Sequence, residues 1–258
     1  MRILVTNDDG VFARGLWALV RELKDFAQVT VAAPDREQSA IGTAVTLREP
    51  LKLQEIEPAV PGVETYSIEG TPADSVILAL GKLVKDKVDL VISGINQGLN
   101  LGEDVLISGT VGAALQGYLH GLPSLAISTD RENKLHLDTV ARLAALLVKR
   151  ITSNSLPSSL FLNVNVPGLP PDRIGPAKIT RLAGESHINT VEEEESGGGK
   201  HYRLVRQRMA SVTDEKTDIW AIEQGNISIT PLSINLSGNS IPALDSLCHG
   251  LLQELQEP

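Results

Sequence analysis

Short apolar runs alternate with amphipathic segments through the first part of the chain. The runs predict buried strands at Arg2–Thr6, Val29–Ala33, Val88–Ser93, Ser124–Ser128 and Leu160–Val166. Between them, apolar residues at helical spacing predict helices at Gly15–Lys24, Thr71–Lys85, Thr110–His120 and Leu135–Ile151. Strands joined by helices of this length are typical of βαβ units. The pattern therefore predicts an α/β fold of Rossmann-like type, with a mostly parallel sheet and flanking helices.

The pattern changes after Pro167, where proline-rich turns follow. Two strands, a short strand that returns to the core and a terminal helix are expected at Lys178–Leu182, Tyr202–Met209, Ile227–Ile229 and Ser240–Leu255. The first two strands would form an extended hairpin with the acidic run Glu192–Glu195 at its solvated tip. We therefore expect a catalytic core at residues 1–167 and an appendage at residues 168–258. The projecting hairpin and the terminal helix are expected to serve oligomerisation.

Composition excludes several function classes. The 258 residues include 23 Lys and Arg against 32 Asp and Glu, which gives a formal net charge of −9. An acidic chain is a poor partner for long nucleic acid, whose phosphates attract Lys and Arg. No apolar run reaches the roughly 18 residues of a membrane span. The single cysteine, Cys248, fits a reducing compartment. We expect a cytoplasmic location, with neither a membrane nor long nucleic acid as partner.

Candidate metal ligands follow three of the predicted strands. Ligands bind at the carboxyl ends of the strands in an open parallel sheet. Asp8 and Asp9 follow the first strand, Ser39 follows the second and Asn96 follows the third. Adjacent carboxylates that the fold desolvates are costly unless a cation neutralises them, and oxygen ligands suit Mg²⁺ or Mn²⁺. In the alternative interpretation, one aspartate caps a helix near Val11–Gly15 and the other faces water.

A candidate anion site lies at the start of a helix. Ser108, Gly109 and Thr110 would present backbone N–H groups at the positive end of the helix dipole, and glycine allows a close approach. An ordinary N-cap formed by Ser108 or Thr110 is the alternative. A metal site beside an anion site is typical of metal-assisted phosphoryl chemistry. The sequence contains no P-loop, no dinucleotide-binding glycine fingerprint and no nucleophile elbow.

Five ordered motifs together resemble the SurE family of stationary-phase survival proteins. They are ILVTNDDG (Ile3–Gly10), APDREQSAIG (Ala33–Gly42), GTPADS (Gly70–Ser75), SGINQGLNLG (Ser93–Gly102) and SGTVGAA (Ser108–Ala114). The later segments NVNVP (Asn163–Pro167) and TDIWAIEQGNISITPL (Thr217–Leu232) resemble the family as well. The resemblance implies a Rossmann-like core and a metal-dependent phosphomonoesterase that acts on nucleoside 5′- and 3′-monophosphates, with short polyphosphate as a further substrate of some members. It also implies a homodimer or homotetramer formed through the C-terminal half.

The resemblance also implies roles for individual residues. One divalent ion per subunit, Mg²⁺ or Mn²⁺, would be held by Asp8, Asp9, Ser39 and Asn96. The substrate phosphate would be bound by Asn96, Ser108, Gly109 and Thr110, with Asp8 and Asp9 as catalytic residues. Ser75 stands where family members usually carry cysteine, which we interpret as a packing variation.

Two mechanisms and three rival functions remain open at this point. Water attacks phosphorus directly, with Asp8 or Asp9 accepting its proton, or an aspartate forms a covalent aspartyl-phosphate. The main rival function is a non-catalytic nucleotide or metal sensor on the same fold. A haloacid-dehalogenase-type phosphatase would carry Asp-x-Asp rather than adjacent aspartates. A nicotinamide-dependent oxidoreductase would carry the missing glycine fingerprint.

Overall fold

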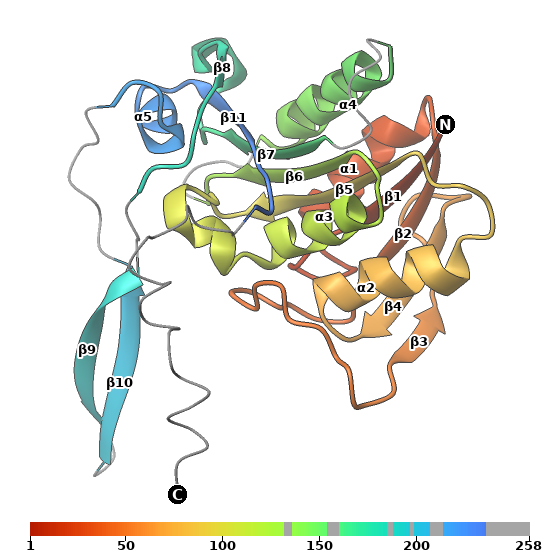
Figure 1. Ribbon diagram of the computed structural model, residues 1–258, viewed down its shortest axis with the longest axis horizontal. Coiled ribbons are helices and arrows are strands. Elements are labelled where there is room, and N and C mark those ends of the chain that lie inside the picture. The colour runs from red at the N-terminus through yellow and green to blue at the C-terminus, as the bar shows by residue number, and fades with distance from the viewer. Residues whose placement is uncertain (132–135, 154–159, 185–187, 197–198, 207–213, 236–258) are drawn as a thin grey trace, which may run out of the picture.

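Nine strands form one sheet in the computed structural model, which describes residues 1–131, 136–153, 160–184, 188–196, 199–206 and 214–235. They are β1 (Arg2–Thr6), β2 (Gln28–Pro34), β3 (Lys52–Glu55), β4 (Glu64–Glu69), β5 (Leu90–Gln97), β6 (Ser124–Thr129), β7 (Phe161–Val166), β8 (Ala177–Ile179) and β11 (Ile227–Pro231). The order is β3-β4-β2-β1-β5-β6-β7-β11-β8, and the six strands from β4 to β7 run parallel. In this sheet, β3 runs antiparallel to its neighbour β4, and β11 runs antiparallel to its neighbour β7. The predicted α/β class with a mostly parallel sheet is confirmed (Figure 1).

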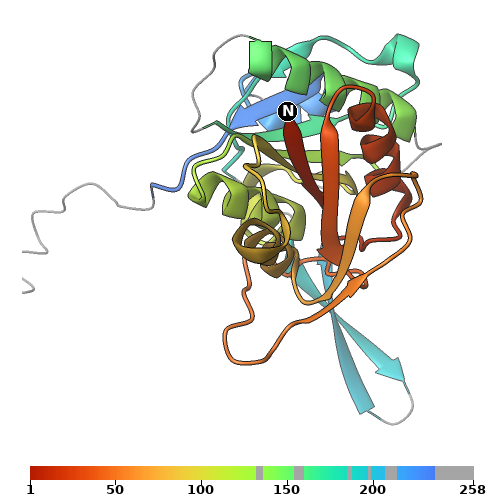
Figure 2. The same cartoon turned by 90° about the vertical axis from the view of Figure 1, so that its right-hand side faces the viewer.

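Helices cover both faces of this sheet, which makes three layers (Figures 1 and 2). On one face lie α1 (Arg14–Lys24) and α4 (Leu137–Ser153), and on the other lie α2 (Pro72–Leu78) and α3 (Gly109–Leu119). Successive side chains of β1 enter different layers, since Val5 packs with α1 and α4 whereas Leu4 packs with α2 and α3. Burial on both faces explains why the central strands read as continuous apolar runs.

The start of α2 follows the sequence prediction. Thr71 is the N-cap, its hydroxyl accepts from Asp74 N at 3.0 Å, and the Asp74 carboxylate accepts from Thr71 N at 2.9 Å. Pro72 occupies the first helical position, where its missing N–H costs nothing. The helical segment continues as a π-helical turn and ends at Leu83, two residues before the predicted end.

Several elements and one strand end were not predicted. Strands β3 and β4 and the short helix α5 (Asp218–Glu223) have too few apolar residues, or too short a run, to give a periodic signal. Strand β5 does not end at Ser93 but continues to Gln97, with an irregular register against β6. Asn96 is therefore on a strand, where it pairs with Ser128, rather than in a loop.

The C-terminal hairpin is present, but one of its predicted strands was wrong. The hairpin joins β9 (Ile188–Ser196) to β10 (Gly199–Arg206) and projects away from the sheet (Figure 1). The segment beginning at Lys178 instead pairs with β11 in the main sheet. The acidic run Glu192–Glu195 lies within β9 rather than beyond its end, and Lys200 of β10 forms an ion pair with Glu193 at 2.7 Å. In the register, Glu195 pairs with Lys200 and Glu192 with Arg203.

Two expectations concern residues outside the described ranges. The terminal helix at Ser240–Leu255 and the end of the strand predicted at Tyr202–Met209 lie there. Within the described ranges, no helix is both long and apolar enough to cross a membrane.

Candidate functional site

The segments that follow β1 and β2 are joined at the carboxyl edge of the sheet. Gln38 donates its backbone N–H to the carbonyl of Asp8 at 2.7 Å, and Val11 donates to the carbonyl of Pro34 at 2.8 Å. These bonds hold the turn that carries the two aspartates against the segment that carries Ser39.

The start of α3 packs directly on Asp8. The Thr110 hydroxyl donates to Asp8 Oδ1 at 2.5 Å. Gly109 is close enough that an added Cβ would lie 2.8 Å from Asp8 Cβ and 3.0 Å from Asp8 Oδ2. A side chain at this position would displace the carboxylate. The structure therefore brings together the predicted metal ligand Asp8 and two of the predicted phosphate ligands, Gly109 and Thr110.

Asp8 is held in an environment that disfavours its charge. It is 4% exposed, and burial, with a smaller contribution from Asp9, raises the pKa of its carboxyl from 3.8 to about 6. Hydrogen bonds from Thr110 oppose this shift without cancelling it. A buried carboxylate with an acidic neighbour gains free energy when a cation binds beside it.

Asp9 connects the turn after β1 to the end of β5. Gln97 donates its backbone N–H to Asp9 Oδ2 at 3.3 Å. Burial raises the pKa of Asp9 and the bond from Gln97 lowers it, while the charge of Glu37 raises it and that of Arg131 lowers it. Glu37 and Arg131 are thus electrostatic neighbours of Asp9, from the segments after β2 and β6.

Ser39 and Asn96 lie at the same edge, with their polar groups partly engaged. Ser39 is exposed, and its hydroxyl donates to Glu37 Oε1 at 2.6 Å. Asn96 is half-buried, and its Nδ2 donates to the carbonyl of Gly98 at 2.7 Å. That bond leaves Oδ1 as the ligand-type atom of the amide. Neither side chain forms a hydrogen bond with Asp8 or Asp9 in the described structure.

The alternative interpretation of a helix N-cap is confirmed for Ser108 but is wrong for the two aspartates. Ser108 is the N-cap of α3, and its hydroxyl accepts from Val111 N at 3.1 Å. Neither aspartate caps α1, whose N-cap Ala13 makes no side-chain cap bond. With the hydroxyls of Ser108 and Thr110 both used inside the protein, the backbone of Gly109 is the part of this trio best suited to approach a ligand.

A buried cluster of amides holds the chain just after β5. Asn100 N donates to Asn165 Oδ1 at 2.8 Å, and Asn163 Nδ2 and Asn165 Nδ2 donate to the carbonyl of Asn100 at 2.8 and 2.9 Å. Asn100 Nδ2 donates to Ser128 Oγ at 2.8 Å. Asp218 Oδ2 accepts from Gly102 N at 2.7 Å. Strands β6 and β7 and helix α5 therefore fix the segment from Asn100 to Gly102, just after the strand that carries Asn96.

No role was predicted from the sequence for this amide cluster, for Glu37 or for Arg131. A signal for the cluster was present, since two asparagines interrupt the apolar strand Leu160–Val166. Arg131 follows a strand at the carboxyl edge, as Asp8 and Ser39 do, so topology also pointed to it. Glu37 is exposed and its interaction with Asp9 depends on the fold of its loop.

The arrangement suits a hard divalent cation. The predicted donors are two carboxylates, a hydroxyl and an amide oxygen, all of the type that Mg²⁺ and Mn²⁺ prefer. Among the residues that the structure describes, no cluster of three or more His, Cys, Asp and Glu forms a richer metal site. The desolvated pair Asp8 and Asp9 is the observation in favour of a cation here.

Comparisons with known proteins give a consistent result. The family model "Survival protein SurE" matches residues 3–189. The 5′-nucleotidase SurE of Dehalococcoides mccartyi strain CBDB1 is 53% identical over 234 residues, covering 90% of this chain and 88% of the relative. The 5′-nucleotidase SurE of Vibrio parahaemolyticus is 43% identical over 249 residues, covering 95% and 94%. The crystal structure of the SurE protein from Aquifex aeolicus matches with a TM-score of 0.81 at 34% identity, covering 98% of this chain and 100% of the other.

Proposed function

The chain belongs to the SurE family, and from this premise we propose that it is a 5′-nucleotidase that hydrolyses nucleoside monophosphates to nucleoside and phosphate. Relatives that carry this activity in their names match nearly the whole chain. The observation in the structure that supports the proposal most strongly is the contact between the buried carboxylate of Asp8 and the start of α3.

We assign the cation to Asp8, Asp9, Ser39 and Asn96, one Mg²⁺ or Mn²⁺ per chain. When bound, it would neutralise the carboxylates and polarise a phosphoryl oxygen. The start of α3 would bind the phosphate through the backbone N–H of Gly109, with the positive end of the helix dipole behind it. Asn96 would contribute its amide at the edge of the same site.

The residues of the site also restrict the route of the reaction. Asp8 is buried and accepts the Thr110 hydroxyl, so it is poorly placed to attack phosphorus as a nucleophile. We therefore favour direct attack by water, with Asp9, the more accessible carboxylate, accepting the proton. Hydrolysis of a nucleotide with a chiral phosphoryl group tests this choice. Inversion of configuration at phosphorus supports a single displacement by water, and retention would indicate two displacements through a covalent aspartyl-phosphate.

Phosphate release from a panel of nucleoside 5′- and 3′-monophosphates and short polyphosphate tests the proposed activity. The protein is first stripped of metal, and Mg²⁺, Mn²⁺ or EDTA is then added. We expect release that needs a divalent ion and that EDTA abolishes. Nucleotide and metal binding without release from any ester would favour the sensor function instead.

We propose that the β9–β10 hairpin packs on a second copy of the chain, as a homodimer or homotetramer. Val191 and Leu204 stand opposite each other in the register and are 59% and 73% exposed, and Tyr202 on the same face is 63% exposed. A lone two-stranded hairpin is only marginally stable in water. Light scattering after size exclusion should show an oligomer that Leu204→Glu weakens. A monomer in the unmodified protein would contradict the proposal.

A further inference from the structure

Arg131 lies at the carboxyl end of β6, a strand that supplies none of the predicted metal or phosphate ligands. Its Nε donates to the carbonyl of Gln97 at 3.0 Å, and the backbone N–H of the same Gln97 donates to Asp9 at 3.3 Å. A guanidinium and a site carboxylate are thus bonded to the backbone of one residue. Among the described side chains, Arg131 nevertheless forms no ion pair with a carboxylate.

The charge at the site shows why a cation at this position matters. Asp9 interacts with both Asp8 and Glu37, and the three carboxylates carry about three negative charges when ionised. One divalent cation would leave about one negative charge, which still repels a phosphate monoester of about −2. The start of α3 offsets about half a charge. Among the described residues, Arg131 is the cation that acts on Asp9. Together with a bound divalent ion and the start of α3, its charge would bring the net charge of the site close to zero.

The chemistry of arginine fits a phosphate ligand. The guanidinium has five N–H donors in a rigid plane, and the bond to Gln97 uses one of them and fixes the side chain at Nε. The terminal nitrogens form the fork that matches two oxygens of a phosphate. A lysine would supply the charge but not the fork.

We propose that Arg131 binds the phosphoryl oxygens of the substrate through its terminal guanidinium nitrogens, beside the start of α3. This inference rests on the proposed nucleotidase function and adds a substrate-binding residue to it. Arg131 is exposed, so replacing it leaves the core intact. Its effect should fall on phosphate binding and much less on metal binding.

The test compares Arg131→Gln and Arg131→Lys with Arg150→Gln, a control that changes an exposed arginine in the last turn of α4. Calorimetry measures Mn²⁺ binding to metal-free protein and inorganic phosphate binding to Mn²⁺-loaded protein. Steady-state kinetics with adenosine 5′-monophosphate gives kcat and KM. We expect Arg131→Gln to weaken phosphate binding and raise KM about tenfold or more, with kcat changed by less than about threefold.

Other outcomes separate this role from its alternatives. Arg131→Lys should recover part of the phosphate affinity, because charge is restored without the fork, and Arg150→Gln should match the unmodified protein. Unchanged phosphate affinity in Arg131→Gln would overturn the proposal. Mn²⁺ affinity that falls in parallel with phosphate affinity would also overturn it, since Arg131 would then only position Gln97 and Asp9. If the unmodified protein hydrolyses no nucleotide, the proposed function fails, but the two binding titrations still decide the role of Arg131.

Discussion

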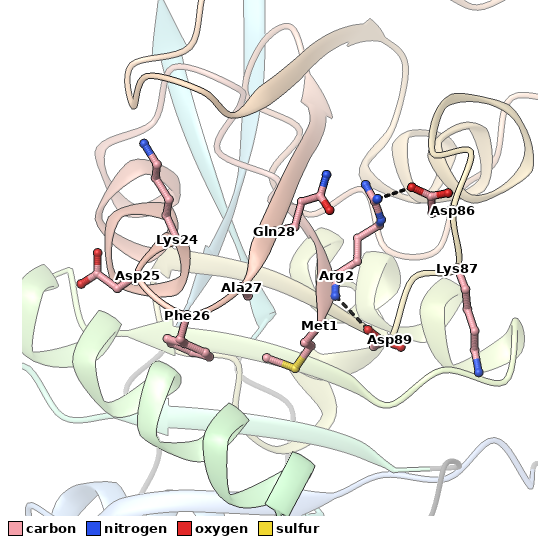
Figure 3. Close-up of a pocket in the computed structure, with 10 residues that line it drawn as sticks. All are labelled: Met1, Arg2, Lys24, Asp25, Phe26, Ala27, Gln28, Asp86, Lys87 and Asp89. Atoms are coloured by element: carbon pink, nitrogen blue, oxygen red, sulfur yellow. Dashed lines mark hydrogen bonds and ion pairs between the residues drawn. The ribbon is translucent and has the colours of Figure 1, made fainter.

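The two ends of the parallel sheet are both rich in charged residues, but only one end balances them. At the amino end, a hollow of about 740 Å³ is lined by three cationic and three acidic side chains, Arg2, Lys24, Lys87, Asp25, Asp86 and Asp89 (Figure 3). Arg2 forms an ion pair with Asp86, and its backbone N–H donates to Asp89 at 2.8 Å. At the carboxyl end, Asp8 and Asp9 lie side by side in the sequence with raised pKa values, and Arg131 is the cation acting on Asp9.

From this difference we infer that charge balance, rather than hollow volume, is the better guide to the end of the sheet that binds ligands. Charges that are already paired gain little from a ligand, and exposed pairs of this kind are worth little to stability. Buried carboxylates without a counter-charge gain a large part of their lost solvation when a cation arrives. The carboxyl edge is therefore where we expect ligand binding.

The largest expected effect is on kcat/KM, when one aspartate at each end of the sheet is replaced by asparagine. Asp9→Asn removes a charge from the proposed cation site and should reduce kcat/KM for adenosine 5′-monophosphate by at least about 10²-fold, or roughly 2.7 kcal/mol. Asp89→Asn makes the same replacement at the amino end and should leave kcat/KM within about twofold. Equal losses in the two variants would contradict the comparison, and so would near-normal activity in Asp9→Asn.

The raised pKa of Asp8 predicts a pH dependence of stability in the metal-free protein. Because burial raises this pKa from 3.8 to about 6, the folded state binds the proton more tightly than the unfolded state. The contribution of Asp8 to the free energy of unfolding should therefore rise as pH falls from about 7 towards 4, by at most about 3 kcal/mol. The raised pKa of Asp9 acts in the same direction.

Urea unfolding in EDTA across this pH range measures the effect. Asp8→Asn should be more stable than the unmodified protein near pH 7 and should lose that advantage at low pH. An advantage that does not change with pH would show that the environment of Asp8 is not the one described. At neutral pH, saturating Mn²⁺ should remove the stability advantage of Asp8→Asn, because the cation binds to and stabilises only the unmodified site.

The amide cluster should have an intermediate effect. Asn165→Ala removes two hydrogen bonds to buried Asn100, which we expect to cost about 2 kcal/mol of unfolding free energy and to weaken Mn²⁺ binding by loosening the segment after β5. Ser128→Ala removes one bond to the same residue and should cost about half as much. Thermal or urea unfolding with a Mn²⁺ titration checks both. Unchanged Mn²⁺ affinity in Asn165→Ala would limit the cluster to a structural role.

The smallest effect is expected at the amino end. Asp86→Asn breaks the ion pair with Arg2, and the side chain of Asp86 is 74% exposed. Solvent screening limits the loss of unfolding free energy to less than about 1 kcal/mol, with no change in kcat or KM. A clear loss of activity would show that the amino-end hollow takes part in function.

Burial decided how much of the fold could be predicted from the sequence. Strands β1, β2, β6 and β7 were predicted closely because both faces are covered and apolar residues predominate along them. Strand β3 is exposed throughout and left no such signal. The first hairpin strand was predicted at Lys178–Leu182 because the charge of Glu192–Glu195 suggests a solvated tip. The acidic run instead lies in β9, where Glu193 forms an ion pair with Lys200 of β10. Such pairing between strands is not visible in either segment alone.

The candidate site shows a similar division. The convergence of Asp8, Gly109 and Thr110 follows from the rule that parallel strands present their carboxyl ends at one edge. The sequence could not show that the Ser108 and Thr110 hydroxyls would be used internally, because that depends on atomic distances. Arg131 was missed although it follows a strand at the carboxyl edge, because its neighbour Asp9 is far away in the sequence.

A titration of the metal-free protein with Mn²⁺, followed by electron paramagnetic resonance, measures directly whether the carboxyl edge of the sheet holds the cation. We expect one tightly bound ion per chain in the unmodified protein and in Asp89→Asn, and loss of that ion in Asp9→Asn. Tight binding that survives Asp9→Asn, or that is lost in Asp89→Asn, would contradict the assignment of the reactive site to the carboxyl end of the sheet.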